Sequence, residues 1–348
     1  MKYSMMLLVA ISLLTSCGDK HTFDTPVGSD SSGNFQQTGT QNLSSIVEIT
    51  PHDDPSDYYN DAFHAKYLSN LSNPSKISDK DLKNLKSELN KVLKWEHTRV
   101  PGKRDSSKRC PKGAKESNSC YSHDFDTYRD YSLARTYLYG KIHLQVTDEG
   151  EYALDTLYCQ KVFTSKDLKN PQYSIGVMKK PDYNTINAEH IWPRSKFEEV
   201  KESNFYNLKL ADIHNLSPSF AKTNQERWNY PFGNLTPDAS VVKNFSEYCD
   251  TSDAVVFTKN NNNYIEAPDA VKGDIARAMF YMSARYFNYK KPQSMNIDAE
   301  QEAVLRGWHK LDPVSDEERE RNNKIFSVQH NRNPFVDYPE LVDLVDDL

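Results

Sequence analysis

The sequence contains one long apolar run, Met5 to Leu14, which Lys2 precedes. At about ten residues this run is too short to cross a bilayer, and its length and position are typical of the core of a signal peptide. Export would place the rest of the chain in an oxidising environment, where cysteines pair. The fold is therefore expected to be fastened by disulfides, and this constrains it more than any other feature of the sequence.

The apolar run ends in Leu14-Thr15-Ser16-Cys17-Gly18, which resembles a bacterial lipobox. Residues 1–16 are therefore predicted to be a lipoprotein signal peptide, and Cys17 is predicted to be acylated and to anchor the protein to a membrane. Ordinary cleavage beside an incidental cysteine is the alternative. The expected location is the outer membrane, the cell surface or the periplasm of a bacterium, with secretion as a further alternative.

Residues 17–77 are rich in Ser, Asn, Asp, Gly and Thr and poor in large apolar side chains. Such a segment cannot offset its chain entropy by burial, so it is predicted to be a flexible tether. Residues 78–338 carry helix and strand signals and are predicted to form one mixed domain, which we expect to be monomeric. Residues 339–348 are predicted to be an acidic tail.

Four cysteines follow Cys17 in the sequence. An even number favours disulfides, and the short gap between Cys110 and Cys120 suggests a local loop, which leaves Cys159 to pair with Cys249. The sequence alone does not prove this pairing. A zinc site is the alternative, but the chain has no Cys-x-x-Cys pair and lacks the short chelating spacings of zinc sites.

Helix signals dominate the predicted domain. The capping-box patterns Ser78-Asp79-Lys80-Asp81 and Ser315-Asp316-Glu317-Glu318 predict two helix starts, and the second helix is expected to extend to about Val328. Aromatic and apolar residues at helical spacing predict two further helices, one over Tyr128–Leu138 and one after Pro268.

Short apolar runs at Tyr152–Val162 and Leu208–Leu216 predict strands between these helices. The expected fold class is α+β, mainly helical with short antiparallel strands.

The candidate chemistry lies in Asn187-Ala188-Glu189-His190-Ile191-Trp192-Pro193. A Glu-His pair is weak evidence alone, because such pairs are common on surfaces. A second segment, Asp212-Ile213-His214-Asn215, is followed by Asn224, and the gap from His190 fits two strands returning into a helix that turns Asn224 toward Glu189. Carboxylate and amide oxygens suit Mg²⁺, which keeps several waters and is completed by substrate phosphate.

With these residues in place, the chain resembles the bacterial endonuclease I family of ββα-metal (His-Me finger) nucleases. The resemblance spans roughly residues 94–339 and includes, in fixed order, Ala134-Arg135, Tyr139-Gly140-Lys141-Ile142, Tyr158-Cys159, the segment from Lys272 to Met282, and Gln329-His330-Asn331-Arg332-Asn333-Pro334-Phe335.

The resemblance implies a role for each candidate residue. Glu189 and Asn224 would be metal ligands, His190 the general base, and the ββα unit the core of the site. The implied enzyme is a Mg²⁺-dependent endonuclease that hydrolyses DNA, and also RNA as a second substrate, with little sequence specificity and with 5′-phosphate products. A noncatalytic nucleic-acid-binding lipoprotein on the same scaffold is the rival interpretation.

Two departures from the family's pattern leave roles open. The insertion that carries the transition-state arginine is shorter here, so Arg194 and Arg227 are candidates by position only. The carboxylate that orients the base corresponds to Leu210, so Asp212, His214, Asn187 or a backbone carbonyl would have to take its place. Asp212 and His214 are equally suited to local structural hydrogen bonds, and Trp192 and Trp228 are expected to be packing residues.

The formal net charge of −6 does not exclude binding to a polyanion, because binding depends on where the cations lie. Lysines and arginines crowd the stretch from Lys83 to Lys115, which is either a phosphate-binding surface or an ordinary solvated face. Arg277, Arg321 and Arg332 are further candidates for phosphate contacts, although Arg277 and Arg332 could equally brace the fold.

Overall fold

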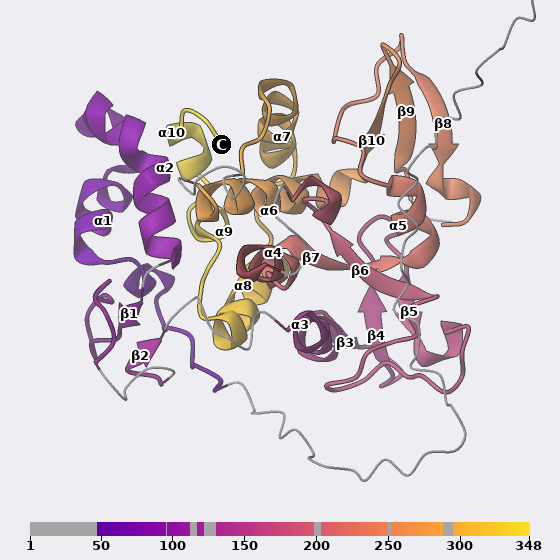
Figure 1. Ribbon diagram of the computed structural model, residues 1–348, viewed down its shortest axis with the longest axis horizontal. Coiled ribbons are helices and arrows are strands. Elements are labelled where there is room, and N and C mark those ends of the chain that lie inside the picture. The colour runs from indigo at the N-terminus through magenta and orange to yellow at the C-terminus, as the bar shows by residue number, and fades with distance from the viewer. Residues whose placement is uncertain are drawn as a thin grey trace, which may run out of the picture. The chain divides into compact units, whose positions relative to one another are not determined.

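Helices and short strands alternate along the part of the chain that the structure describes (Figure 1). The computed structural model describes residues 47–94, 96–111, 117–121, 130–197, 203–249, 252–287 and 295–348. The predicted signal peptide, Cys17 and the first part of the predicted tether lie outside these residues.

The helices vary from single turns to about four turns. They are α1 (Asp61–Lys66), α2 (Asp79–Lys94), α3 (Tyr131–Tyr137), α4 (Asn204–Leu210), α5 (Ala221–Arg227), α6 (Lys272–Arg285), α7 (Ala299–Leu311), α8 (Asp316–Gln329), α9 (Pro334–Asp337) and α10 (Leu341–Leu344).

The strands of the described residues are short, and the pairs that form their sheets are antiparallel. They form four small sheets: β1 (His97–Thr98) with β2 (Cys120–Tyr121); β3 (Leu144–Val146), β4 (Tyr152–Asp155) and β5 (Val162–Thr164); β6 (Ile186–His190) with β7 (Leu216–Phe220); and β8 (Ser240–Asn244), β9 (Val255–Lys259) and β10 (Asn262–Glu266). The fold is α+β, as the sequence predicts.

Side-chain caps begin the two helices that the capping-box patterns predict. The Ser78 hydroxyl accepts a hydrogen bond from the backbone N–H of Asp81 at the start of α2, and the Ser315 hydroxyl accepts one from Glu318 at the start of α8. Each bond satisfies a backbone donor that the first helical turn leaves without a partner.

Two clusters of buried side chains form the core. The first surrounds α6, which is buried along nearly its whole length and packs against α2, α7 and α9 (Figure 1). The second lies among α3, β4, β5 and β6. Helix α8 contributes to both, with Phe326 in the first cluster and Ile325 in the second, so it joins the helical part to the strand pair β6–β7.

Both ends of the predicted domain differ from the prediction. Within the predicted tether, residues 55–76 form α1 and short 3₁₀ turns, and their aromatic side chains are buried in the first core cluster: Tyr58, Tyr59, Phe63 and Tyr67. The predicted acidic tail also packs into this cluster, because its apolar residues Leu341, Val342, Val345 and Leu348 are buried while its carboxylates are not.

The strand predicted over Leu208–Leu216 is wrong. The segment holds the end of α4 and a 3₁₀ turn over Ile213–Asn215, and β7 begins only at Leu216. The Asp212 side chain caps the 3₁₀ turn by accepting a hydrogen bond from the backbone of His214, and this local bond competes with extended structure.

Both predicted disulfides are present. Cys110 and Cys120 close a short loop beside β2, with their Cα atoms 5.6 Å apart. Cys159 and Cys249 join the segment after β4 to the segment after β8, with Cα atoms 5.2 Å apart. Among the described helices, none has the length and apolar character needed to span a membrane.

Candidate active site

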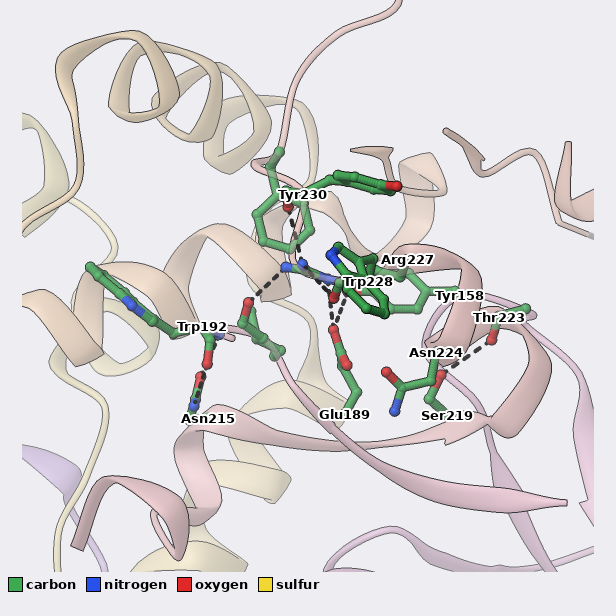
Figure 2. Close-up of polar contacts among 12 residues, drawn as sticks. Tyr158, Glu189, Trp192, Asn215, Ser219, Thr223, Asn224, Arg227, Trp228 and Tyr230 are labelled. Atoms are coloured by element: carbon green, nitrogen blue, oxygen red, sulfur yellow. Dashed lines mark hydrogen bonds and ion pairs between the residues drawn. The ribbon is translucent and has the colours of Figure 1, made fainter. Parts of the chain in front are cut away.

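The strand pair β6–β7 and the helix α5 that follows it carry the candidate residues. In the antiparallel register Glu189 lies opposite Ser217, and His190, the last residue of β6, lies opposite Leu216. Helix α5 begins directly after β7 and contains Asn224. Figure 2 shows the side-chain amide of Asn224 turned toward the carboxylate of Glu189. The two oxygen-bearing side chains therefore face each other across the strand pair and the helix.

Glu189 is 3% exposed, and one of its two carboxylate oxygens is held by donors. Its Oε1 accepts a hydrogen bond from the Tyr158 hydroxyl at 2.8 Å and forms an ion pair with Nε of Arg227 at 2.8 Å. Burial raises the pKa of the carboxyl, and the Arg227 guanidinium offsets part of that rise. Oε2 receives no side-chain donor from the part of the chain that the structure describes.

Asn224 has its side-chain nitrogen fixed. Nδ2 donates to Oδ1 of Asn187 at 2.6 Å and lies 3.4 Å from the carbonyl oxygen of Ala188. Both acceptors belong to β6, and Asn187 shares a face of that strand with Glu189, since residues two apart point the same way. The side-chain oxygen of Asn224 accepts no hydrogen bond from the described residues, so it remains available to a ligand.

Arg227 is fully enclosed behind the Glu189 carboxylate, with 1% of its surface exposed. Its guanidinium donates to three backbone carbonyl oxygens, those of Trp228 at 3.2 Å, Tyr230 at 3.0 Å and Ile191 at 3.1 Å. The planar fork of an arginine can satisfy this set, whereas the single ammonium of a lysine cannot. Arg227 therefore fixes Glu189 relative to the backbone on both sides of the site.

His190 is the last residue of β6, and its ring has different neighbours from the Glu189 carboxylate. Its Nε2 lies 3.0 Å from the carbonyl oxygen of Leu210, and its ring packs against Tyr131 with centroids 5.4 Å apart. A carbonyl only accepts, so Nε2 carries the hydrogen and Nδ1 is the basic nitrogen. Burial, with smaller effects from the charges of Arg194 and Arg135, lowers the pKa of His190 from 6.5 to about 4.

This arrangement can be compared with proteins of known family. The family model described as Endonuclease I matches residues 83–340, which is most of the chain. The chain belongs to the endonuclease I family.

Several relatives of this endonuclease I chain are named as nucleases. It is similar to an extracellular ribonuclease of Bacillus subtilis (34% identical over 175 residues, 45% of this chain and 52% of the relative) and to an extracellular deoxyribonuclease of Aeromonas hydrophila (28% over 169 residues, 44% and 66%). It is also similar to Endonuclease-1 of Buchnera aphidicola (26% over 193 residues, 51% and 71%). The chain spans about half the length of the extracellular ribonucleases of two Bacillus species that it matches.

The remaining candidates of this endonuclease I chain separate into two places. Asn187 holds the Asn224 amide, whereas Asp212 and His214 lie in the core beneath α6. His214 hydrogen-bonds the carbonyl of Asn331 through Nε2 and packs on Tyr281, and burial holds the pKa of its ring well below the usual value. No hydrogen bond in the described structure links Asn187, Asp212 or His214 to His190, whose partner is the Leu210 backbone.

The arginines that the sequence suggests for phosphate contacts are of two kinds, one exposed and the others bonded to groups of the fold. Arg194 is exposed in the 3₁₀ turn Arg194–Lys196 that follows β6, and its charge reaches His190. Arg277 and Arg332 instead form buried ion pairs with Glu318 and Asp337, as the bracing alternative predicts. Arg321 donates to backbone carbonyls and to His143, so it braces the fold too.

The donor set around Glu189 and Asn224 fits a hard divalent cation. One carboxylate oxygen and one amide oxygen are the ligand types that Mg²⁺ takes, and Mg²⁺ commonly keeps waters and substrate oxygens in its other positions. Over the described ranges, no group of three or more His, Cys, Asp and Glu residues could hold a metal ion.

Three contributions to this site have no clear signal in the sequence. The Leu210 carbonyl is a backbone group, which leaves no trace in residue type. Tyr131 reads as a core residue of a helix, and Tyr158 stands out only because it precedes the paired Cys159. The disulfide could have indicated that Tyr158 is fixed in place, but not what it binds.

Proposed function

We propose that this protein is an exported, Mg²⁺-dependent endonuclease that hydrolyses phosphodiester bonds of DNA, and also of RNA, with little sequence specificity. The observation that supports this most strongly is that the carboxylate of Glu189, which has side-chain donors on Oε1 only, faces the Asn224 side chain, whose oxygen accepts no hydrogen bond from the described residues (Figure 2). The relatives' names, extracellular ribonuclease and extracellular deoxyribonuclease, support both substrates.

Glu189 and Asn224 would hold the cation through Oε2 and Oδ1, because Oε1 and Nδ2 already have partners. A cation bound there offsets the negative charge that develops on the phosphoryl and leaving oxygens. Tyr158 and Arg227 keep the Glu189 carboxylate oriented before substrate arrives, so no reorganisation is needed during the reaction.

His190 acts as the general base of the proposed reaction. Its Nε2–H is committed to the Leu210 carbonyl, so Nδ1 takes a proton from the attacking water. With a pKa of about 4 the ring is neutral near pH 7 and can accept that proton. The hydroxide attacks phosphorus in line with the 3′ oxygen, which leaves, and the products carry a 5′-phosphate and a 3′-hydroxyl.

The two candidate arginines take different parts in this proposal. Exposed Arg194, close to His190, contacts the phosphate as its charge grows in the transition state. Buried Arg227 is a positioning residue, because its hydrogen bonds and ion pair go to Glu189, Tyr158 and the backbone, and its guanidinium also lies over the Phe232 ring.

The protein would work outside the cytoplasm as a monomer. The signal-like segment, the two disulfides and the extracellular and periplasmic names of the relatives support export. Acylation of Cys17 would tether it to the outer membrane or cell surface.

The test is cleavage of supercoiled plasmid and of a labelled RNA by the purified mature protein. We expect cleavage with Mg²⁺, none with a chelator, and 5′-phosphate ends that a ligase accepts. His190→Ala is expected to lower the rate by about 10²–10⁴-fold. The matched control is His64→Ala in α1, which contributes no residue to the site and should cleave at the normal rate.

Two outcomes would contradict the proposal. Full activity of His190→Ala would exclude His190 as the base. Binding of nucleic acid without cleavage under any divalent cation would favour the noncatalytic nucleic-acid-binding lipoprotein instead.

A further inference from the structure

Trp228, which the sequence predicts to be a packing residue, has a largely exposed side chain beside the site. Trp192, the other tryptophan near the motif, is 8% exposed and packs in the core as predicted. Trp228 is 51% exposed. It follows Arg227 directly, and Figure 2 shows its indole together with the Arg227–Glu189 pair. A large aromatic surface is therefore presented to solvent next to the candidate metal ligands.

The backbone of Trp228 adopts a conformation that favours glycine. Its φ of 56° and ψ of −130° lie in a region that residues with a side chain rarely occupy. The surrounding bonds hold it there, because its N–H donates to the Asn224 carbonyl at 3.3 Å and its own carbonyl accepts from Arg227. A tryptophan at such a backbone conformation costs stability.

The turn that carries Trp228 is attached to the segment that carries Arg194. Nδ2 of Asn229 donates to Oγ of Ser195 at 3.1 Å, which joins the end of α5 to the turn after β6. Arg194, Ser195 and Lys196 are all exposed in that turn. The turn that carries Trp228 is thus bonded to a turn with exposed cations, which can hold the phosphates of a nucleic-acid strand.

A single exposed apolar residue needs no explanation by itself. Trp228 combines three features that an incidental residue lacks, namely a strained backbone, hydrogen bonds to the helix of Asn224 and to Arg227, and a link to exposed cations. Indole rings stack on nucleobases of any sequence, since every base has a flat face.

We propose that the Trp228 indole is a stacking platform for an unpaired base next to the scissile phosphate. This rests on the proposed function. Bases in a duplex are already stacked on their neighbours, so the contact is made with single strands and with locally unpaired segments. The consequence is tighter binding of single-stranded than of double-stranded nucleic acid at this position.

The experiment measures binding without turnover, in the His190→Ala protein with Mg²⁺, using a fluorescein-labelled single-stranded oligonucleotide. Adding Trp228→Ala is expected to weaken binding by about tenfold, the scale of one base–aromatic stack, whereas Trp228→Phe keeps most of the affinity. A second oligonucleotide has the same backbone with abasic sites throughout. It should bind equally to the protein with native Trp228 and to the Trp228→Ala variant, because it offers no base to stack.

Two variants separate stacking from packing. Trp228→Gly relieves the positive φ, so its melting temperature should be unchanged or higher while its affinity falls as in Trp228→Ala; a packing role would lower both. Tyr173→Ala removes another exposed aromatic ring, in the loop before β6, and should change neither.

The outcomes distinguish this inference from the function on which it rests. Unchanged affinity of the Trp228→Ala protein would overturn the stacking role, and so would an equal loss with the abasic strand. Either result would leave the nuclease proposal standing, because plasmid cleavage by the protein with native His190 tests that proposal separately. Absence of binding to every oligonucleotide would overturn both.

Discussion

Glu189 and Asp212 are two buried carboxylates of the same strand-pair region, and their surroundings differ. Each is 3% exposed and each lies beside an arginine. Both oxygens of Asp212 are occupied, and the donors are the Tyr281 and Tyr286 hydroxyls, Arg285, the Gln329 amide and the backbone of His214. Glu189 has side-chain donors on one oxygen only.

This contrast distinguishes a carboxylate that holds the fold together, Asp212, from one that can bind a ligand, Glu189. Buried polar atoms almost always have partners, because a missing hydrogen bond in the interior costs about 1–3 kcal/mol. Asp212 meets that requirement within the fold and ties α6, α8 and the turn before β7 together. Glu189 has side-chain donors on Oε1 only, and its carboxylate faces Asn224 (Figure 2). A ligand that satisfies both oxygens would complete the second network.

The largest effect is expected from neutralising each carboxylate in turn. Glu189→Gln should lower the cleavage rate per folded molecule by about a thousandfold, since cation charge at the phosphate contributes several kcal/mol. Asp212→Asn should leave that rate nearly unchanged but lower the free energy of unfolding by about 3–5 kcal/mol, as expected when one partner of a buried ion pair is removed. Urea denaturation and plasmid cleavage measure the two quantities.

Metal-dependent stability provides the control for this pair of variants. Glu189→Gln also breaks a buried ion pair, so this variant will lose stability as well. The free energy of unfolding alone therefore cannot distinguish Glu189→Gln from Asp212→Asn. A bound cation stabilises the folded state by about 2.7 kcal/mol at a hundred times its dissociation constant. Added Mg²⁺ should raise the melting temperature of native protein and of Asp212→Asn, but not of Glu189→Gln. The reverse pattern would contradict the assignment of the two carboxylates.

The sequence predicted the parts of this comparison that depend on residue type and spacing. Helical periodicity and Ser caps located α2, α6 and α8, and the spacing from His190 to Asn224 indicated two strands followed by a helix. The even number of cysteines and the short gap between Cys110 and Cys120 predicted both disulfides. Each of these signals is local or is a simple count, which is why it survives without knowledge of the fold.

The parts that the sequence did not predict depend on long-range packing. Tyr58, Tyr59, Phe63 and Tyr67 are sparse among polar residues, so average composition hides a cluster that becomes a core only against α2 and α9. The sequence left a backbone carbonyl as one of several alternatives for the partner of His190, and only the fold identifies the carbonyl of Leu210. The hydrogen bonds around Asp212 come from residues far along the chain, Gln329 being 117 positions away.

The two disulfides are expected to differ in how much they stabilise the fold and in whether they affect the site. Chain-entropy arguments give about 4.6 kcal/mol for a 90-residue loop and about 2.7 kcal/mol for a 10-residue loop. Replacing Cys159 and Cys249 by Ala should therefore destabilise the protein by about 2 kcal/mol more than replacing Cys110 and Cys120. Urea denaturation of the two double variants measures this.

The same variants also test the connection to the site. Cys159 is adjacent to Tyr158, whose hydroxyl donates to Glu189. Loss of the Cys159–Cys249 disulfide should therefore lower the activity per folded molecule. Loss of Cys110–Cys120 should not. Equal activity per folded molecule in both variants would show that Tyr158 is held by packing alone.

The smallest expected effect is on the pKa values of two buried histidines, His190 and His214. In metal-free protein, burial should place the titration midpoint of His190 near pH 4 instead of 6.5, and that of His214 well below its usual value. The sign follows from linkage: the unfolded chain takes up a proton near pH 6.5 and the folded His190 only near 4, so stability is lost as pH falls between these values. Titration of labelled histidine by NMR, assigned with His190→Gln, measures both rings.

Tyr131→Ala is the variant that tells the two histidines apart. The Tyr131 ring covers His190, with centroids 5.4 Å apart, and removing it should hydrate the imidazole and raise the pKa of His190 toward 6.5 while His214 stays unchanged. A midpoint of His190 that is near 6.5 already in the native protein would mean that the ring is open to solvent. The protonation state of His190 would then be set by the pH of the solution and not by burial in the fold.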